Sequence, residues 1–152
     1  MHPITLPFIQ SFFKKRVTDS HKGTYGHALL IVGNEGRMGA AIIASKACLR
    51  SGCGLLTVAI PFSERFIVQT ILPEAMIIDR NKPIDFSLYT SIGIGPAIRS
   101  DKDSVSLLEL IISYSKIPLV IDADALTILS GKTELLSQLP SKTILTPHSK
   151  EC

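Results

Sequence analysis

Residues 28–50 read ALLIVGNEGRMGAAIIASKACLR, and this stretch decides the fold class. Five consecutive apolar residues, 28–32, end at Gly33, which is typical of a short strand that is buried on both faces. A loop over Asn34–Met38 follows. Residues 39–50 are rich in alanine and place apolar side chains at helical spacings, which predicts a helix that packs closely on a sheet. The stretch is therefore interpreted as a strand, a loop and a helix.

The same alternation continues along the chain. Apolar runs predict further strands at 55–60, 75–78, 91–94, 119–121 and 143–145, with helices between them at 61–72, 104–115 and 125–129. Strands that alternate with helices imply βαβ units and a mostly parallel sheet. The predicted fold class is α/β, a three-layer arrangement with helices on both faces of the sheet. We expect a lead-in over residues 1–26 and the α/β part over residues 27–152.

Composition indicates one globular domain of 152 residues. The net charge of +3 is too small to indicate nucleic acid, and we expect the basic cluster Lys14-Lys15-Arg16 to be a solvated face. No apolar run reaches the roughly 18 residues that a membrane span needs. The cysteines lack metal-ligand spacing, and Cys48 is expected to be a buried thiol in a reducing compartment. We expect a soluble, cytoplasmic protein with no nucleic acid or membrane partner.

The residues suited to ligand binding all follow predicted strands. In parallel α/β sheets, ligands bind beyond the carboxyl ends of the strands. The segments at those ends are 33–38, 93–96, 122–124 and 146–148. Because parallel strands end at the same edge of a sheet, we expect the four segments to converge on one site.

The first segment belongs to a glycine-rich loop. Gly33, Gly36 and Gly39 form G-x-x-G-x-x-G between a strand and a helix, where glycines and free N–H groups can admit a phosphate. The spacing matches neither the G-x-G-x-x-G dinucleotide fingerprint nor a P-loop. A phosphate-proximal loop, which would include Asn34, and simple turn geometry are equally good interpretations.

Two carboxylates and one histidine follow later strands. Asp122 and Asp124 are suited to bind Mg²⁺ through water or to accept hydroxyl protons. Alternatively, Asp124 caps a helix that begins at Ala125, and for Asp124 we favour the cap. His148 is a ligand candidate or an ordinary packed side chain. The sequence contains no Ser-His-Asp arrangement, HExxH motif or paired-cysteine site, so no directly bound metal is predicted.

Several motifs, in order, resemble the NAD(P)H-hydrate dehydratase family over about residues 20–150. They are His21-Lys22-Gly23-Thr24-Tyr25-Gly26, 29–33, Met38-Gly39-Ala40-Ala41, 49–55, Gly93-Ile94-Gly95-Pro96, 119–126 and Leu145-Thr146-Pro147-His148. The resemblance implies a ribokinase-like fold. It also implies repair of nicotinamide cofactors by dehydration of hydrated NADH or NADPH, with ADP or ATP and Mg²⁺ as cofactors.

The resemblance implies site residues as well. Ala40, the turn Gly95-Pro96-Ala97 and His148 match positions that contact the hydrated dinucleotide. Asp122 and Asp124 match an acidic pair that we expect to make polar or water-mediated metal contacts. The family usually has Gly-Pro-Gly at the turn, so Ala97 is a departure that puts one backbone contact in doubt.

The family's later half carries a Lys-Gly segment and a Gly-Thr-Gly-Asp motif, which bind the adenine nucleotide and supply the catalytic aspartate. Both would lie after Cys152. The resemblance therefore implies an incomplete, truncated ribokinase-like domain over residues 1–152, with no catalytic residue in this chain. We expect the chain alone to be inactive and its parent to be a lyase. An incomplete sheet has an unpaired edge and uncovered apolar faces, so we also expect a homo-oligomer.

Two other functions are open at this point. A ribokinase-like vitamin or sugar kinase would share the fold, and a non-catalytic module would bind a dinucleotide without chemistry. A Rossmann dehydrogenase is disfavoured by the glycine spacing. It is also disfavoured because Ile60-Pro61 stands where an acidic residue would end the second strand.

Overall fold

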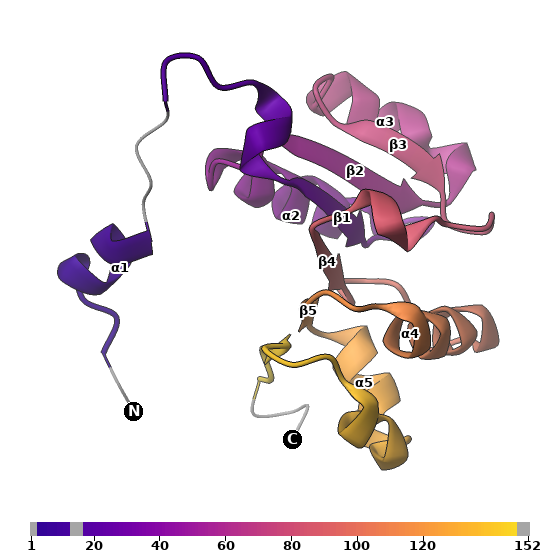
Figure 1. Ribbon diagram of the computed structural model, residues 1–152. Coiled ribbons are helices and arrows are strands. Elements are labelled where there is room, and N and C mark those ends of the chain that lie inside the picture. The colour runs from indigo at the N-terminus through magenta and orange to yellow at the C-terminus, as the bar shows by residue number, and fades with distance from the viewer. Residues whose placement is uncertain (1–2, 13–16, 149–152) are drawn as a thin grey trace.

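Six parallel strands form one sheet in the computed structural model, which describes residues 3–12 and 17–148 (Figure 1). Their order in space is β3-β2-β1-β4-β5-β6. Their bounds are β1 His27–Ile31, β2 Leu55–Ile60, β3 Met76–Asp79, β4 Ser91–Ile94, β5 Leu119–Ile121 and β6 Ile144–Leu145. The predicted parallel α/β sheet is confirmed. The basic cluster Lys14-Lys15-Arg16 and Cys152 lie outside the described residues.

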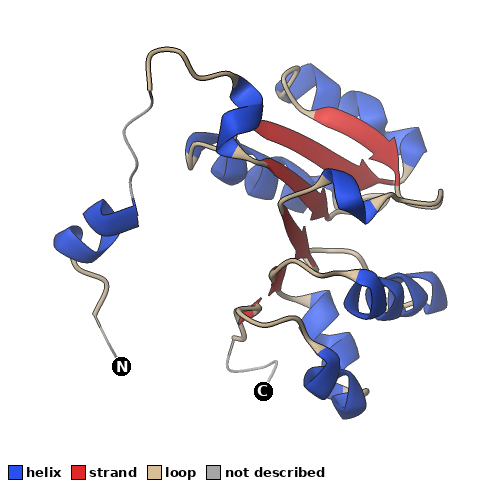
Figure 2. Ribbon diagram, viewed as in Figure 1, coloured by secondary structure: helices blue, strands red, loops and turns tan. Residues whose placement is uncertain are grey.

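Helices cover both faces of the sheet (Figure 2). Their bounds are α1 Leu6–Phe12, α2 Met38–Arg50, α3 Arg65–Ile71, α4 Lys102–Tyr114 and α5 Asp124–Ser130. Short 3₁₀ turns lie at Lys22–Tyr25, Phe62–Glu64, Phe86–Leu88 and Thr133–Gln138. Helices α2 and α3 pack on one face, and α4 and α5 pack on the other. Within the described part of the chain, every helix is too short or too polar to cross a membrane.

Strand β1 contributes to both cores. Leu29 and Ile31 are fully buried beneath α4 and α5, whereas Ala28 and Val32 pack beneath α2 and α3. Successive side chains of a strand point to opposite faces, so a strand between two helical layers must be apolar at every position. This explains the continuous apolar run at residues 28–32.

Two helix ends show how local signals set the boundaries. Gly52 follows α2 with a φ of 97°, the left-handed conformation in which a glycine commonly ends a helix. Helix α4 begins at Lys102, two residues before the predicted start. The reason is a cap, because the Asp101 side chain accepts a hydrogen bond of 2.9 Å from the Ser104 backbone N–H.

The helical layer on the α2 side covers only part of the sheet. On that side Val120 of β5 is 41% exposed, although its neighbours in the strand are buried on the opposite face. Ile144 and Leu145 of β6 are also exposed. Parallel sheets usually have both faces covered, so strands β4 to β6 present an open apolar face beside α2.

Ser45 offers a test of this packing. Its hydroxyl on α2 is fully buried and has no hydrogen-bond partner among the described residues. Because an unsatisfied buried hydroxyl is unfavourable, we predict that Ser45→Ala raises the free energy of unfolding by about 1 kcal/mol in urea denaturation. Ser104 is the control, since its buried hydroxyl donates to the Ile98 carbonyl at 2.8 Å. Ser104→Ala should lower stability by about 1 kcal/mol, and equal losses in both variants would contradict the prediction.

Candidate functional site

The candidate site lies where the chain leaves the two central strands in opposite directions. After β1 the chain passes to α2 on one face, and after β4 it passes to α4 on the other face. Such a switch point opens a crevice at the carboxyl ends of the strands, where α/β proteins bind ligands. The predicted segments 33–38 and 93–96 flank this point.

Hydrogen bonds join the two flanking loops. The Gly33 N–H donates to the Pro96 carbonyl at 2.8 Å, and the Asn34 side-chain amide donates to the Ile98 carbonyl at 3.3 Å. The Asn34 side-chain oxygen also accepts a bond from the Glu35 N–H. Since both polar atoms of this buried side chain are engaged within the protein, Asn34 stabilises the loop. Any contact of this segment with a phosphate would come from the backbone.

The three loop glycines differ in backbone conformation and in the space around them. Gly33 and Gly36 have φ values of 72° and 73°, so turn geometry accounts for both. At Gly33 a Cβ would also lie 3.0 Å from the Cβ of Ala41. Gly39, in the first turn of α2, has open space where a Cβ would lie. A ligand is therefore best accommodated at Gly39 and its neighbour Ala40, and that role stays a prediction.

The loop after β4 packs directly on the loop after β5. A Cβ on Gly95 would overlap the carbonyl oxygen of Asp122, so only glycine allows this approach. Two nearby residues, Ala97 and Ala123, have left-handed φ values of 59° and 48° although they carry side chains. Backbone strain of this kind clusters at ligand sites.

Asp124 does not cap a helix that begins at Ala125, so that prediction is wrong. Helix α5 begins at Asp124 itself and has no side-chain cap. Instead, Asp124 Oδ2 accepts a hydrogen bond of 2.8 Å from the Arg99 N–H. The left-handed turn at Ala123 places Asp124 inside the helix, and its carboxylate joins the loops that follow β4 and β5.

A cavity of about 480 Å³ is lined by residues from several of the predicted segments. Pro96, Asp122, Thr146 and His148 line it at the carboxyl ends of β4, β5 and β6. The rest of the lining is mainly apolar and belongs to the open face of the sheet beside α2. The remaining predicted residues, Gly33, Asn34, Gly36, Gly39, Ala40, Gly95, Ala97 and Asp124, lie in the adjoining loops and are not among its lining residues.

Cys48 also lines this cavity, on α2. It is half-buried, which is less than the sequence predicted. Burial, and then the neighbouring Cys53, raise the pKa of the Cys48 thiol to about 12. Because the thiolate is the reactive form, Cys48 is a packing residue of the cavity wall.

Arg80 is a residue at this edge that the sequence analysis missed. It directly follows β3, and its guanidinium Nη1 donates a hydrogen bond of 2.8 Å to the Gly33 carbonyl. The available signal was the charged pair Asp79-Arg80, which follows the apolar run at 75–78. His27, by contrast, lies at the opposite edge, where its Nε2 is 2.8 Å from the Thr57 hydroxyl oxygen. Burial lowers the pKa of His27, which fits a structural role.

The strain at Ala97 gives a testable prediction. A left-handed residue with a side chain is disfavoured by roughly 1–2 kcal/mol relative to glycine, so Ala97→Gly should raise the free energy of unfolding by about 1 kcal/mol. Ala47 is the control, because it is exposed and lies within helix α2, toward its C-terminal end. Ala47→Gly should lower stability by about 1 kcal/mol. Chemical denaturation measures the free energy of unfolding of both variants. A lower stability of Ala97→Gly would contradict the prediction that the backbone at Ala97 is strained.

Curated proteins similar to this chain are NAD(P)H-hydrate dehydratases. The chain is 38% identical to the ADP-dependent (S)-NAD(P)H-hydrate dehydratase of Lactiplantibacillus plantarum, over 99% of this chain and 56% of that protein. Its Staphylococcus aureus counterpart is also 38% identical, over 97% of this chain and 55% of that protein. The chain thus spans about half the length of the curated relatives it matches.

Solved structures that resemble this chain include a member of the same family. A crystal structure of a Bacillus subtilis ADP/ATP-dependent NAD(P)H-hydrate dehydratase, co-crystallized with ATP/Mg²⁺, superposes with a TM-score of 0.79 at 27% identity. The match covers 97% of this chain and 53% of that one. A ribokinase-like superfamily protein from Enterococcus faecalis superposes with a TM-score of 0.85 at 28% identity, over 97% of this chain and 54% of that one. The family model of NAD(P)H-hydrate dehydratase matches residues 28–152, and this chain belongs to that family.

Proposed function

We propose that this chain forms the substrate-binding half of an NAD(P)H-hydrate dehydratase domain, and that residues 1–152 are one part of that domain. In the complete enzyme, hydrated NADH or NADPH would lose water at the expense of ADP or ATP hydrolysis. The observation that carries the proposal is the cavity at the sheet edge. Pro96, Asp122 and His148, which come from three separate segments, line it together.

The cavity suits a dinucleotide whose reacting ring carries hydroxyl and amide groups. Its volume of about 480 Å³ lies within the usual range for small-molecule sites. The apolar wall, which includes Val32 and Val120, would hold the flat ring. Asp122 and His148 at the rim would form hydrogen bonds with its polar groups. Ala40 and the Gly95-Pro96-Ala97 turn would add close backbone contacts.

The cofactors of this proposal, ADP or ATP and Mg²⁺, are supported by the names of the relatives. Mg²⁺ prefers several oxygen ligands and commonly keeps water molecules. The described residues contain no group of three His, Cys, Asp or Glu side chains that could hold a metal. One oxygen of Asp124 already accepts a bond from Arg99, which leaves Asp122 as a carboxylate facing the cavity. These residues do not form a complete Mg²⁺ site, and the nucleotide contacts are assigned to the half of the relatives that this chain does not match.

The first test is binding of hydrated NADH to this chain by calorimetry. We expect binding without turnover when ADP or ATP is added. His148→Ala should weaken binding about fivefold, as expected for the loss of one hydrogen bond of about 1 kcal/mol. His21→Ala is the matched control, because this exposed histidine precedes β1 at the opposite edge, and its affinity should not change. Absence of binding by the unmodified chain would refute the proposed site, and clear turnover would refute the expected inactivity.

We also infer that the chain forms a homo-oligomer in the cytoplasm. The cytoplasmic location is supported by the free thiols of Cys48 and Cys53. Association is supported by the exposed apolar face that includes Val120. It is also supported by α1, which stands apart from the sheet with no buried residue (Figure 1).

Light scattering at micromolar concentration should show a mass above that of one chain. Val120→Lys should shift the distribution toward the monomer, because a charge on the open face opposes apolar association. Ile43→Lys is the control, since Ile43 is exposed on α2 and is not among the residues that line the open cavity. A monodisperse monomer of the unmodified chain would contradict the inference.

A further inference from the structure

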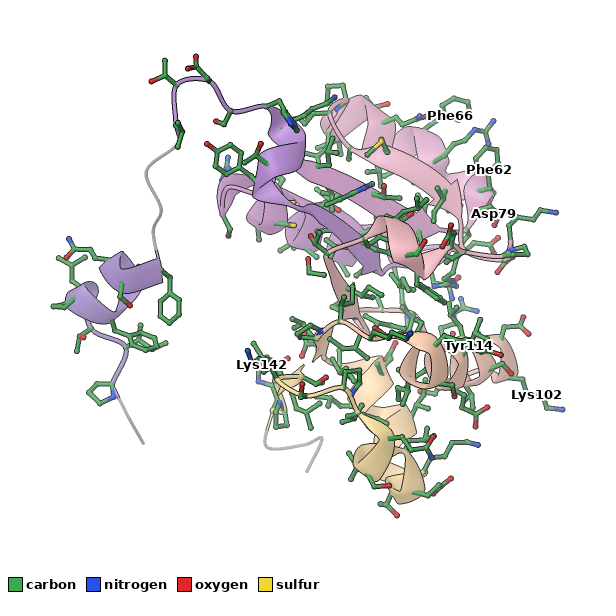
Figure 3. The ribbon with its side chains drawn as sticks, in the orientation of Figure 1. Phe62, Phe66, Asp79, Lys102, Tyr114 and Lys142 are labelled. Atoms are coloured by element: carbon green, nitrogen blue, oxygen red, sulfur yellow. The ribbon has the colours of Figure 1, made fainter. Side chains whose placement is uncertain are left out.

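Arg80 connects the edge strand β3 to the centre of the candidate site. Its backbone N–H continues the sheet by donating to the Ile60 carbonyl at 3.0 Å. Its guanidinium reaches across to the Gly33 carbonyl at 2.8 Å, 47 positions away in sequence. Asp79, the residue before it, marks this corner of the molecule in Figure 3.

Among the described residues, the guanidinium has no close ionic partner. Arg80 is half-buried, and burial is the main cause that lowers its pKa. The charges of Asp101, Asp103 and Asp79 favour its charged form, and that of Arg99 opposes it. In the described part of the chain, none of these carboxylates forms an ion pair with it. Instead, Asp79 accepts a hydrogen bond from the Asn81 backbone N–H, and Asp101 accepts one from the Ser104 backbone N–H.

A half-buried cation needs good hydrogen bonds to offset its lost hydration. The bond to the Gly33 carbonyl provides one, and it acts on the peptide at which the chain turns from β1 toward α2. Gly33 has a φ of 72°, and its own N–H donates a hydrogen bond to the Pro96 carbonyl. Gly33 is therefore held from both sides, by Arg80 on the β3 side and by Pro96 on the β4 side.

Gly33 in turn packs on the first turns of α2. A Cβ there would lie 3.1 Å from Met38 Sδ and 3.0 Å from the Cβ of Ala41, so these groups already enclose it closely. The Gly33 backbone therefore lies against the first turn of α2, between Met38 and Ala41, which flank Gly39 and the predicted contact at Ala40.

We propose that Arg80 is a positioning residue, whose bond to the Gly33 carbonyl holds the glycine loop and the start of α2 against the turn after β4. The effect on ligand binding rests on the proposed function. The effect on loop structure does not.

The test compares Arg80→Met, which removes the donor, with Arg80→Lys, which keeps a cationic donor. Amide hydrogen exchange of the ligand-free chain should be about tenfold faster in Arg80→Met at Gly33, whose N–H donates to the Pro96 carbonyl, with exchange in β2 and α4 unchanged. Affinity for hydrated NADH should fall about tenfold in Arg80→Met and be largely restored in Arg80→Lys.

Arg65→Met is the matched control. Arg65 also donates one bond to a backbone carbonyl, that of Phe62 at 2.8 Å, and lies over the rings of Phe62 and Phe66, which Figure 3 labels. This variant should alter neither loop exchange nor affinity. Unchanged exchange at Gly33 in Arg80→Met, or a uniform rise across the whole sheet, would overturn the proposal. If the unmodified chain fails to bind hydrated NADH, the proposed function fails, and the exchange data still decide the role of Arg80.

Discussion

The structure depends on the burial of β1 on both faces. Leu29 and Ile31 pack under one helical layer, and Ala28 and Val32 pack under the other. A central strand of this kind requires helices on both sides of the sheet. The chain must therefore go to one face after β1 and to the opposite face after β4. The divergence of the loops at these strand ends is a direct consequence of that burial, and it creates the crevice in which the candidate site lies.

Most of the fold could be predicted from local patterns, because continuous apolar runs and glycine boundaries determine where each strand begins and ends. The early start of α4 depends on one capping carboxylate, Asp101, and such single hydrogen bonds shift helix boundaries. The sequence analysis favoured Asp124 as a cap because aspartate is a common capping residue. The cap position depends on backbone angles, however, and nothing in the sequence indicates the left-handed φ of Ala123, which places Asp124 inside α5. Arg80 was missed for another reason. Its partner, Gly33, is 47 positions away and becomes a neighbour only once β1, β2 and β3 are adjacent.

The loops of the site combine strain with tight packing. Ala97, Arg99 and Ala123 adopt left-handed angles, and Gly95 contacts the Asp122 backbone too closely for any side chain. These features persist because neighbouring hydrogen bonds hold the loops, as the bond between Arg99 and Asp124 does. The same strain agrees with the expectation, drawn from the resemblance, of a glycine at the position of Ala97. In this chain the turn keeps the left-handed backbone although the methyl group of Ala97 makes that conformation less favourable.

The cavity and the open face of the sheet are one continuous surface. Gly93 and Val120 belong to both, whereas Asp122 and His148 stand at the rim. Any segment that covers the open face also closes the cavity, because the two share the same apolar floor. Closure would exclude water, and hydrogen bonds between a ligand and Asp122 or His148 would then be stronger in the less polar surrounding. The relatives that this chain matches are nearly twice its length, so a further segment is available in them to cover that face. Under the proposed function, ligand binding in the cavity and coverage of the sheet would be a single physical event, with Gly93 and Val120 in the floor and Asp122 and His148 at the rim.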